Sequence, residues 1–269
     1  MLSFLITLLI FSAMNKNPAL YETYINDLKI YSRKLNEARL AASQLLLMHK
    51  EVVERKAPVV LELGVDRGQS TKVFLNAIDK KPSSRLISVD IRDCSKVSDS
   101  KLWTFLKMDS IDVEGILKKV PLLKKGIDVI YIDSLHTSQH VFKEVYGWFP
   151  FLKKGGVIFF DDIDSTPYLR GQRKDNVGIE ISNRKILELI ESIFISNIDI
   201  IDLTLIRGST GLARIEKMCA QEINLNPPKV IQKRNNLFFA KLLNLLFRKK
   251  QYTHSVNSNE SFLIDVTKY

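Results

Sequence analysis

One segment decides the fold of this 269-residue chain: Pro58-Val-Val-Leu-Glu-Leu-Gly-Val-Asp-Arg-Gly68. Its apolar run predicts a short buried strand, which ends at Gly64. The residues from Gln69 to Ile78 predict a helix directly after the second glycine. A strand that turns into a helix through glycines lets a ligand approach the main chain at the carboxyl end of the strand, where open α/β sheets bind their ligands.

Further apolar runs of strand length follow the first one. They are Arg85 to Asp90, Ile127 to Ile132 and Gly156 to Phe160. Helical stretches, such as Ser138 to Trp148 and Ile181 to Ile195, lie between or after them. Strands that alternate with helices predict βαβ units and a mostly parallel sheet. Ile198 to Ile206 and Leu212 to Ile215, joined by a glycine turn, predict a closing hairpin.

The composition is that of an ordinary globular protein, with 45% hydrophobic and 26% charged residues. A disordered, collagen-like or coiled-coil protein is therefore excluded. The two cysteines, Cys94 and Cys219, have no metal-like spacing, which argues against a disulfide scaffold and a cysteine-type zinc site. A reducing compartment fits, and we expect the protein to be cytoplasmic.

Basic residues are concentrated near the carboxyl end of the chain. The net charge is +10, and seven of these charges lie between Ile223 and Asn259, where there is no Asp or Glu. The rest of the chain carries only 10 − 7 = +3, so no nucleic-acid partner is expected. The basic, amphipathic segment 229–250 has three interpretations: a helix docked on the core, peripheral contact with an anionic membrane surface, or nucleic-acid contact. The last is the least favoured, because no recognised nucleic-acid motif accompanies the segment.

The amino-terminal part is predicted to be helical. The apolar residues 1–13 are too short for the ~20 residues of a membrane span, and no Lys or Arg precedes them as in a signal peptide. A buried or interfacial helix is favoured there, with an anchor, a signal or a misplaced gene start as alternatives. Helical spacing of apolar residues continues from Pro18 to Arg55. We therefore expect a helical extension (1–55), an α/β domain (56–217) and a basic tail (218–269), and the extension could join copies into a homo-oligomer.

Asp90 ends the second predicted strand, 22 residues after Gly68. A carboxylate at this point is placed to accept hydrogen bonds from ribose hydroxyls. The G-x-G-x-x-G dinucleotide pattern is not met, because Asp66 holds the middle glycine position, and the P-loop pattern is absent. A chance pair of glycines in a strand–loop–helix turn is the alternative.

Three segments resemble motifs of class I S-adenosylmethionine-dependent methyltransferases. Val60 to Thr71 resembles their first motif. Ile132-Asp-Ser-Leu-His136 and Phe151 to Asp162 are similar to later motifs of the branch that holds the macrocin and mycinamicin sugar O-methyltransferases and the cephalosporin-hydroxylase-like proteins. The resemblance covers about Pro58 to Glu216. It implies a Rossmann-like sheet of about seven strands, mostly parallel with one antiparallel strand, plus amino-terminal helices and a basic tail.

The resemblance also implies that S-adenosylmethionine binds at the ends of the first strands. The first loop would hold the methionine part of the cofactor, Asp90 would bind the ribose, and the residues after the third strand would flank the adenine. The predicted cofactor-binding residues are Glu62, Gly64, Gly68, Ser70, Asp90, Asp109 and Ser110.

Acidic residues follow the fourth and fifth strands. Asp133 lies three residues before His136, and Asp161 and Asp162 follow the next strand. Neighbouring strand ends in a parallel sheet open onto one cleft, and oxygen ligands suit Mg²⁺. We therefore predict a Mg²⁺ site at Asp133, Asp161 and Asp162, as the metal dependence of the related sugar methyltransferases implies. Helix capping is the alternative for these residues, and it is the favoured interpretation of Asp164.

The predicted catalytic residues are His136 and Asp133. A metal would lower the pKa of a substrate hydroxyl, and His136 would accept the proton. The predicted function is a metal-assisted O-methyltransferase that acts on a hydroxyl of a sugar or glycosylated small molecule. The alternatives are a structural His136 and a catalytically inactive fold that acts as a membrane-surface module. Oxygenase chemistry is disfavoured, because no 2-His-1-carboxylate pattern occurs.

For two other features, an interpretation without a functional role is favoured or equally supported. His140 and His254 are expected to be structural or solvated. The long polar loop from Asp164 to Gly178 is either a lid or a plain surface loop.

Overall fold

The computed structural model describes residues 18–29, 35–174, 176–229 and 263–265. The predictions for residues 1–13, for the basic segment beyond residue 229 and for His254 lie outside the described residues.

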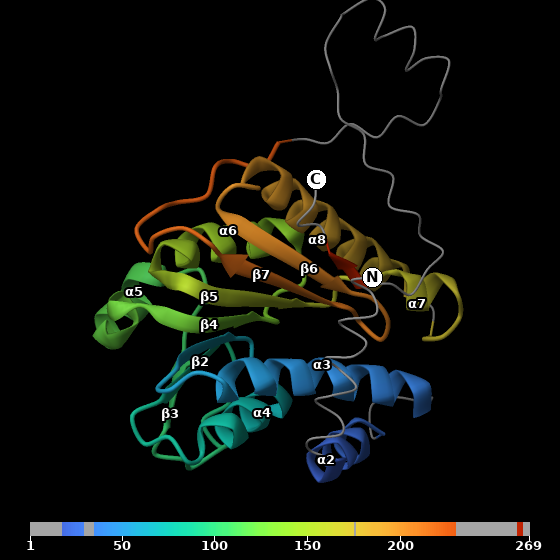
Figure 1. Ribbon diagram of the computed structural model, residues 1–269. Helices are drawn as coiled ribbons and strands as arrows, with labels where there is room; N and C mark the ends of the chain where they lie inside the picture. Colours follow the sequence, from blue (N-terminus) through green and yellow to red (C-terminus); the bar gives the residue numbers. More distant parts are fainter. Residues whose placement is uncertain (1–17, 30–34, 175, 230–262, 266–269) are drawn as a thin grey trace, which may run out of the picture.

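A single sheet runs through the centre of the molecule (Figure 1), in the order β3-β2-β1-β4-β5-β7-β6-β8. Its strands are β1 (Val59–Leu63), β2 (Arg85–Asp90), β3 (Trp103–Lys107), β4 (Ile127–Ile132), β5 (Leu152–Asp161), β6 (Ile201–Ile206), β7 (Leu212–Lys217) and β8 (Leu263–Asp265). Strands β1 to β5 are parallel, and β7 is antiparallel to both β5 and β6. The predicted Rossmann-like sheet of about seven strands, with one antiparallel strand, is confirmed. The short β8 adds an antiparallel pairing to β6.

The order of the strands reverses between β1 and β4, and this position determines where a ligand can bind. Leu63 and Ile132 are register partners at the carboxyl ends of β1 and β4. The residues that follow them, Gly64 and Asp133, therefore begin adjacent turns. Open α/β sheets bind ligands in the crevice at such a switch point.

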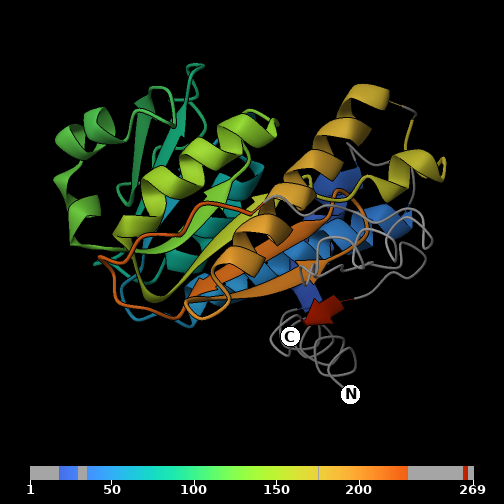
Figure 2. The ribbon, with the colours of Figure 1, turned by 90° about the horizontal axis from the view of Figure 1, so that it is seen from above.

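Helices cover both faces of the sheet, as Figures 1 and 2 show. They are α2 (Pro18–Lys29), α3 (Leu35–Val53), α4 (Gln69–Ile78), α5 (Val113–Lys119), α6 (Ser138–Trp148), α7 (Thr166–Leu169) and α8 (Val177–Ser196), with 3₁₀ turns at Pro121–Lys125 and Phe149–Phe151. Helices α3 and α4 bury Met48 and Phe74 against one face. Helices α5, α6 and α8 bury Leu117, Val145 and Ile190 against the other. Because both faces are covered, every residue of β1 is buried, Glu62 included, as its mostly apolar sequence predicts.

The predicted helical stretch from Pro18 to Arg55 forms two helices that pack against each other. Tyr24 and Ile25 of α2 share a buried cluster with Ala38 and Ala42 of α3. The alanines are small, so the two helices can approach closely. Apolar spacing predicts the helical conformation correctly, but it carries no signal for the change of direction between α2 and α3.

Three predicted starts differ from the structure by three residues or more. Strand β5 begins at Leu152 rather than Gly156, and β6 begins at Ile201 rather than Ile198. Helix α8 begins four residues before the predicted Ile181, because the Asn176 side chain accepts a hydrogen bond from the Ile179 N–H (3.1 Å) and caps the helix there.

Candidate active site

Two glycines shape the turn between β1 and α4, and both adopt left-handed backbone conformations. A Cβ atom on Gly64 would lie 2.0 Å from the carbonyl oxygen of Asp133, and one on Gly68 would lie 2.1 Å from the Val97 side chain. Asp66, which replaces the middle glycine of the usual pattern, is also left-handed (φ 46°). Aspartate tolerates this conformation better than most residues, so the turn keeps its shape without the third glycine.

Glu62 lies beneath this turn and is completely buried. Its carboxylate accepts hydrogen bonds from Ser70 (2.5 Å), Thr71 (2.8 Å) and Ser88. Burial raises the pKa of Glu62 to about 7, although the three hydroxyl groups act in the opposite direction. The predicted cofactor residues Glu62 and Ser70 therefore contact each other, and their polar atoms hold the turn against α4.

Asp90 ties the end of β2 to the same turn. Its carboxylate accepts hydrogen bonds from the backbone N–H groups of Val65 (2.9 Å), Asp66 (3.2 Å) and Arg92 (2.8 Å). Burial alone would raise the pKa of Asp90, but these N–H groups and the Arg92 charge outweigh burial and lower it. The structure therefore places an ionised carboxylate beside the glycine turn, at the position predicted for ribose binding.

Asp109 and Ser110 follow β3 and differ in exposure. Asp109 is exposed, whereas Ser110 is buried. The Ser110 hydroxyl lies 2.9 Å from Nε2 of His140, and its carbonyl accepts a hydrogen bond from the Trp148 indole (2.9 Å). The Met108 N–H donates to the carbonyl of Asp90 (3.0 Å), which brings the turn after β3 next to the end of β2.

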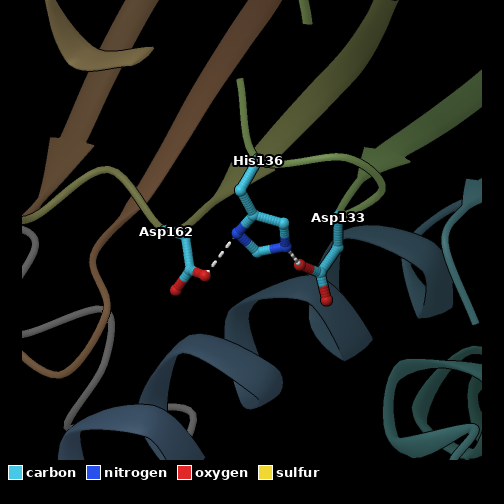
Figure 3. A group of neighbouring side chains, drawn as sticks. All are labelled: Asp133, His136 and Asp162. Atoms are coloured by element: carbon cyan, nitrogen blue, oxygen red, sulfur yellow. Dashed lines mark ion pairs between the residues drawn. The ribbon is translucent and has the colours of Figure 1, made fainter. Parts of the chain in front are cut away.

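Asp133, His136 and Asp162 form a compact group at the ends of β4 and β5 (Figure 3). The imidazole lies between the two carboxylates, with Nε2 at 3.1 Å from Asp133 and Nδ1 at 2.5 Å from Asp162. One ligand atom of each residue lies within 4.8 Å of those of the other two. The structure thus brings together both predicted catalytic residues and two of the three predicted metal ligands.

The two carboxylates control the protonation of His136. Hydrogen bonds to Asp133 and Asp162 raise the pKa of His136 to about 11, against the effect of burial. At neutral pH the side chain is therefore an imidazolium whose two ring nitrogens are both engaged. In this arrangement it cannot accept a proton, so the predicted role as a base requires the ring to lose a proton first and at least one of the two contacts to open.

Asp161 lies outside this group, although it is adjacent to Asp162 in sequence. Asp162 has a left-handed backbone (φ 56°), and this conformation accompanies different directions for the two side chains. The Asp161 carboxylate accepts hydrogen bonds from Tyr131 (2.8 Å) and Thr210 (2.8 Å). The Tyr131 hydroxyl is also 3.3 Å from Asp133, so Asp161 contacts the group through that hydroxyl.

Tyr131 and Thr210 are site residues that the sequence analysis misses. Tyr131 precedes Asp133 by two positions in an extended segment, and this spacing places both side chains on the same face. That signal was available from the sequence. Thr210 lies 49 residues from Asp161 along the chain, and only the β5–β7 pairing brings them together.

Asp164 has a structural role, but not the expected one of a helix N-cap, because Ser165 holds the N-cap position of α7. Its buried carboxylate accepts hydrogen bonds from the N–H groups of Gly208 (2.8 Å) and Thr166 (3.0 Å).

A cavity of about 620 Å³ opens beside the group, between the first turns of α6 and α8. Its lining combines polar side chains with a larger apolar surface, and its residues are His136, Thr137, Ser138, Gln139, Asp162, Gly178, Ile179, Ser182 and Lys185. Since His136 and Asp162 line this cavity, a molecule bound in it would touch the group directly.

A family model described as a methyltransferase domain matches residues 61–163. The match includes the glycine turn, Asp90, and the whole Asp133–His136–Asp162 group. This part of the chain is therefore similar to methyltransferase domains. No curated protein matches the chain.

Solved methyltransferase structures share this fold. A caffeoyl-CoA O-methyltransferase candidate from Staphylococcus aureus superposes with a TM-score of 0.55 at 14% identity, over 78% of this chain and 99% of that chain. A Podospora anserina methyltransferase with bound SAH has a TM-score of 0.51 at 13% identity, over 74% and 87% of the two chains. The MycE methyltransferase of the mycinamycin biosynthetic pathway, in complex with Mg and SAH, gives 0.48 at 20% identity, over 76% of this chain. The present chain spans 63% of the MycE chain.

Among the helices that the structure describes, none has the length and apolar character of a membrane-spanning segment.

Proposed function

We propose that this protein is an S-adenosylmethionine-dependent O-methyltransferase that methylates a hydroxyl of a sugar or glycosylated small molecule with the help of a divalent ion, Mg²⁺. The contact between two turns carries the proposal. The Asp133 N–H donates to the carbonyl of Leu63 (2.8 Å), and Gly64 packs directly against Asp133. A cofactor on the glycine turn would therefore have its methionine end beside the acidic group. The motif resemblance supports the macrocin and mycinamicin branch.

The cofactor would bind across the carboxyl ends of β1, β2 and β3. The backbone of residues 64–68 would contact the methionine part, Asp90 the ribose, and the turn at Asp109 the adenine. Glu62, Ser70 and Ser110 would act through the shape of these turns, because their polar atoms are engaged inside the protein.

Asp133 and Asp162 fit a divalent ion. They offer two carboxylates at one point of the cleft, and Mg²⁺ is commonly held by one or two carboxylates, with water or substrate oxygens completing the shell. Asp161 supports them through Tyr131. A bound ion would lower the pKa of an acceptor hydroxyl and hold its oxygen.

When bound, the cofactor would supply a sulfonium methyl group. The acceptor oxygen would bond to that carbon as the C–S bond breaks and the neutral thioether leaves. The hydroxyl proton would pass to His136 after the imidazolium has lost one proton to solvent and that ring nitrogen has separated from its carboxylate. A positioned base contributes ~10²–10⁴-fold in rate. Alignment of the oxygen, carbon and sulfur atoms contributes up to ~7–11 kcal/mol.

Polar side chains at the cavity, such as Ser138, Gln139 and Ser182, could hydrogen-bond to hydroxyl groups of an acceptor, which supports a sugar acceptor. We also propose that the chain consists of a helical extension (1–55), an α/β domain (56–217) and a basic tail (218–269). The protein would be cytoplasmic, with peripheral membrane contact through residues 229–250. A homo-oligomer that uses the amino-terminal helices is a further proposal.

Isothermal titration with S-adenosylmethionine tests the cofactor, with Asp90→Ala as the variant that loses binding. A chain that does not bind the cofactor refutes the proposed function. Mass spectrometry of a panel of sugar acceptors, with and without EDTA, tests the transfer. Product formation that survives EDTA would remove the ion and leave the methyltransferase proposal intact.

A further inference from the structure

Helix α6 carries a buried polar cluster that the proposed reaction does not use. Glu144 is completely buried, and its Oε1 accepts a hydrogen bond from Ser134 (2.6 Å). His140, one helical turn earlier, lies 3.4 Å from the same oxygen and 2.9 Å from the hydroxyl of Ser110. The cluster therefore extends from Ser110 through His140 and Glu144 to Ser134.

The two ends of this cluster belong to the two turns on which the proposed site depends. Ser110 lies in the turn after β3, next to Asp109. Ser134 directly follows Asp133, and its N–H would lie 2.9 Å from a Cβ atom on Gly64. One pair of side chains on α6 thus touches the adenine side and the acidic side of the proposed site.

Fold stability alone is a poor explanation for this pair. The Trp148 indole already holds the carbonyl of Ser110, and Val141 and Val145 anchor α6 in the apolar core. Glu144 is a buried carboxylate, and its Oε2 has no hydrogen-bond partner among the described residues. Burying such a group costs free energy, and an apolar residue of similar size would serve packing as well or better.

We propose that His140 and Glu144 are positioning residues that fix the turn of Ser110 relative to the turn of Asp133. They thereby set the position of the bound cofactor relative to the acidic group. This proposal rests on the proposed function. Neither residue contacts the reacting atoms; each acts through the serine that it holds.

The test compares His140→Ala and Ser110→Ala with His49→Ala in the full chain. His49 is a matched control, because it is a buried histidine that makes one side-chain hydrogen bond, to Asn76 (2.9 Å), between α3 and α4. We expect His140→Ala and Ser110→Ala each to raise the Kd for SAH roughly tenfold, as outer contacts of a site typically do. The double variant should be no worse than either single one. His49→Ala should leave the Kd within about twofold for a similar loss of Tm.

Glu144→Gln is the conservative variant. It keeps an acceptor for Ser134, so it should bind SAH almost as the natural chain does, whereas Glu144→Ala should not. Equal Kd values for the natural chain and His140→Ala, or an equal loss in His49→Ala, would overturn the proposal.

Hydrogen exchange gives a readout that does not depend on the cofactor. Amides of residues 108–112 and 133–136 should exchange faster in His140→Ala than in His49→Ala. If the natural chain binds no SAH, the proposed function fails, but this exchange pattern still decides the proposal. Unchanged exchange in both turns would refute it.

Discussion

Replacing Glu62 by Gln should change how the stability of the protein depends on pH. Glu62 is completely buried under the glycine turn and accepts three hydroxyl hydrogen bonds. Glutamine has nearly the same shape but does not titrate in this range. The variant therefore isolates the ionisation of one buried carboxyl from its packing.

The magnitude follows from the pKa of Glu62, which burial raises from 4.5 to about 7. Because the folded state holds the proton more tightly than the unfolded state, the stabilisation is fully present below pH 4.5 and is lost as the pH rises through 7. The difference between the two pKa values corresponds to about 3 kcal/mol of unfolding free energy lost between pH 4.5 and about 8. The stability of Glu62→Gln relative to the natural chain should rise by that amount over the same interval.

Urea unfolding followed by circular dichroism, from pH 4.5 to about 8, measures this difference. Glu54→Gln serves as the control for the substitution itself, because Glu54 is exposed and directly follows α3. If the Glu62→Gln difference is constant with pH, the carboxyl is ionised throughout, and the assignment of a raised pKa is wrong.

Three further outcomes follow from the structure. Gly64→Ala should lose cofactor binding in calorimetry and lower Tm, because its Cβ would overlap the Asp133 carbonyl and its φ is +95°; retained binding would contradict the close packing of the two turns. Tyr131→Phe should weaken Mn²⁺ binding, measured by calorimetry, about 10–100-fold by removing the hydroxyl between Asp161 and Asp133; an unchanged affinity would separate Tyr131 from the site. Burial lowers the pKa of Lys217 to about 8, so this group's contribution to stability should increase as the pH rises from about 8 towards 10.5; Lys217→Met should abolish that increase in urea unfolding.

The sheet could be predicted from the sequence because its central strands are buried on both faces. Their sequences are mostly apolar, and glycine or aspartate marks their carboxyl ends, as at Gly64, Asp90 and Asp133. The turn between α2 and α3 was not predictable in the same way, since apolar spacing continues through both helices. Strand β8 had no signal, because three residues are too few to show a periodicity.

The candidate site was predicted by position but not by orientation. Asp161 and Asp162 look equivalent in sequence, yet the left-handed backbone at Asp162 accompanies opposite surroundings for the two carboxylates. The sequence predicts that His140 is structural or solvated. Its contact with Ser110 could not be predicted, because it depends on how α6 lies across the turn after β3. Such contacts are set by packing between elements, and no local pattern records them.

The last strand has a consequence for how the molecule meets its neighbours. Residues 263–265 hydrogen-bond to Thr204, Leu205 and Ile206, at the border of the sheet that would otherwise offer unpaired main-chain groups. An open border of this kind is a template for adding strands from other chains. A chain shortened before Leu263 would leave β6 uncovered, so it should self-associate at concentrations where the full chain stays dispersed.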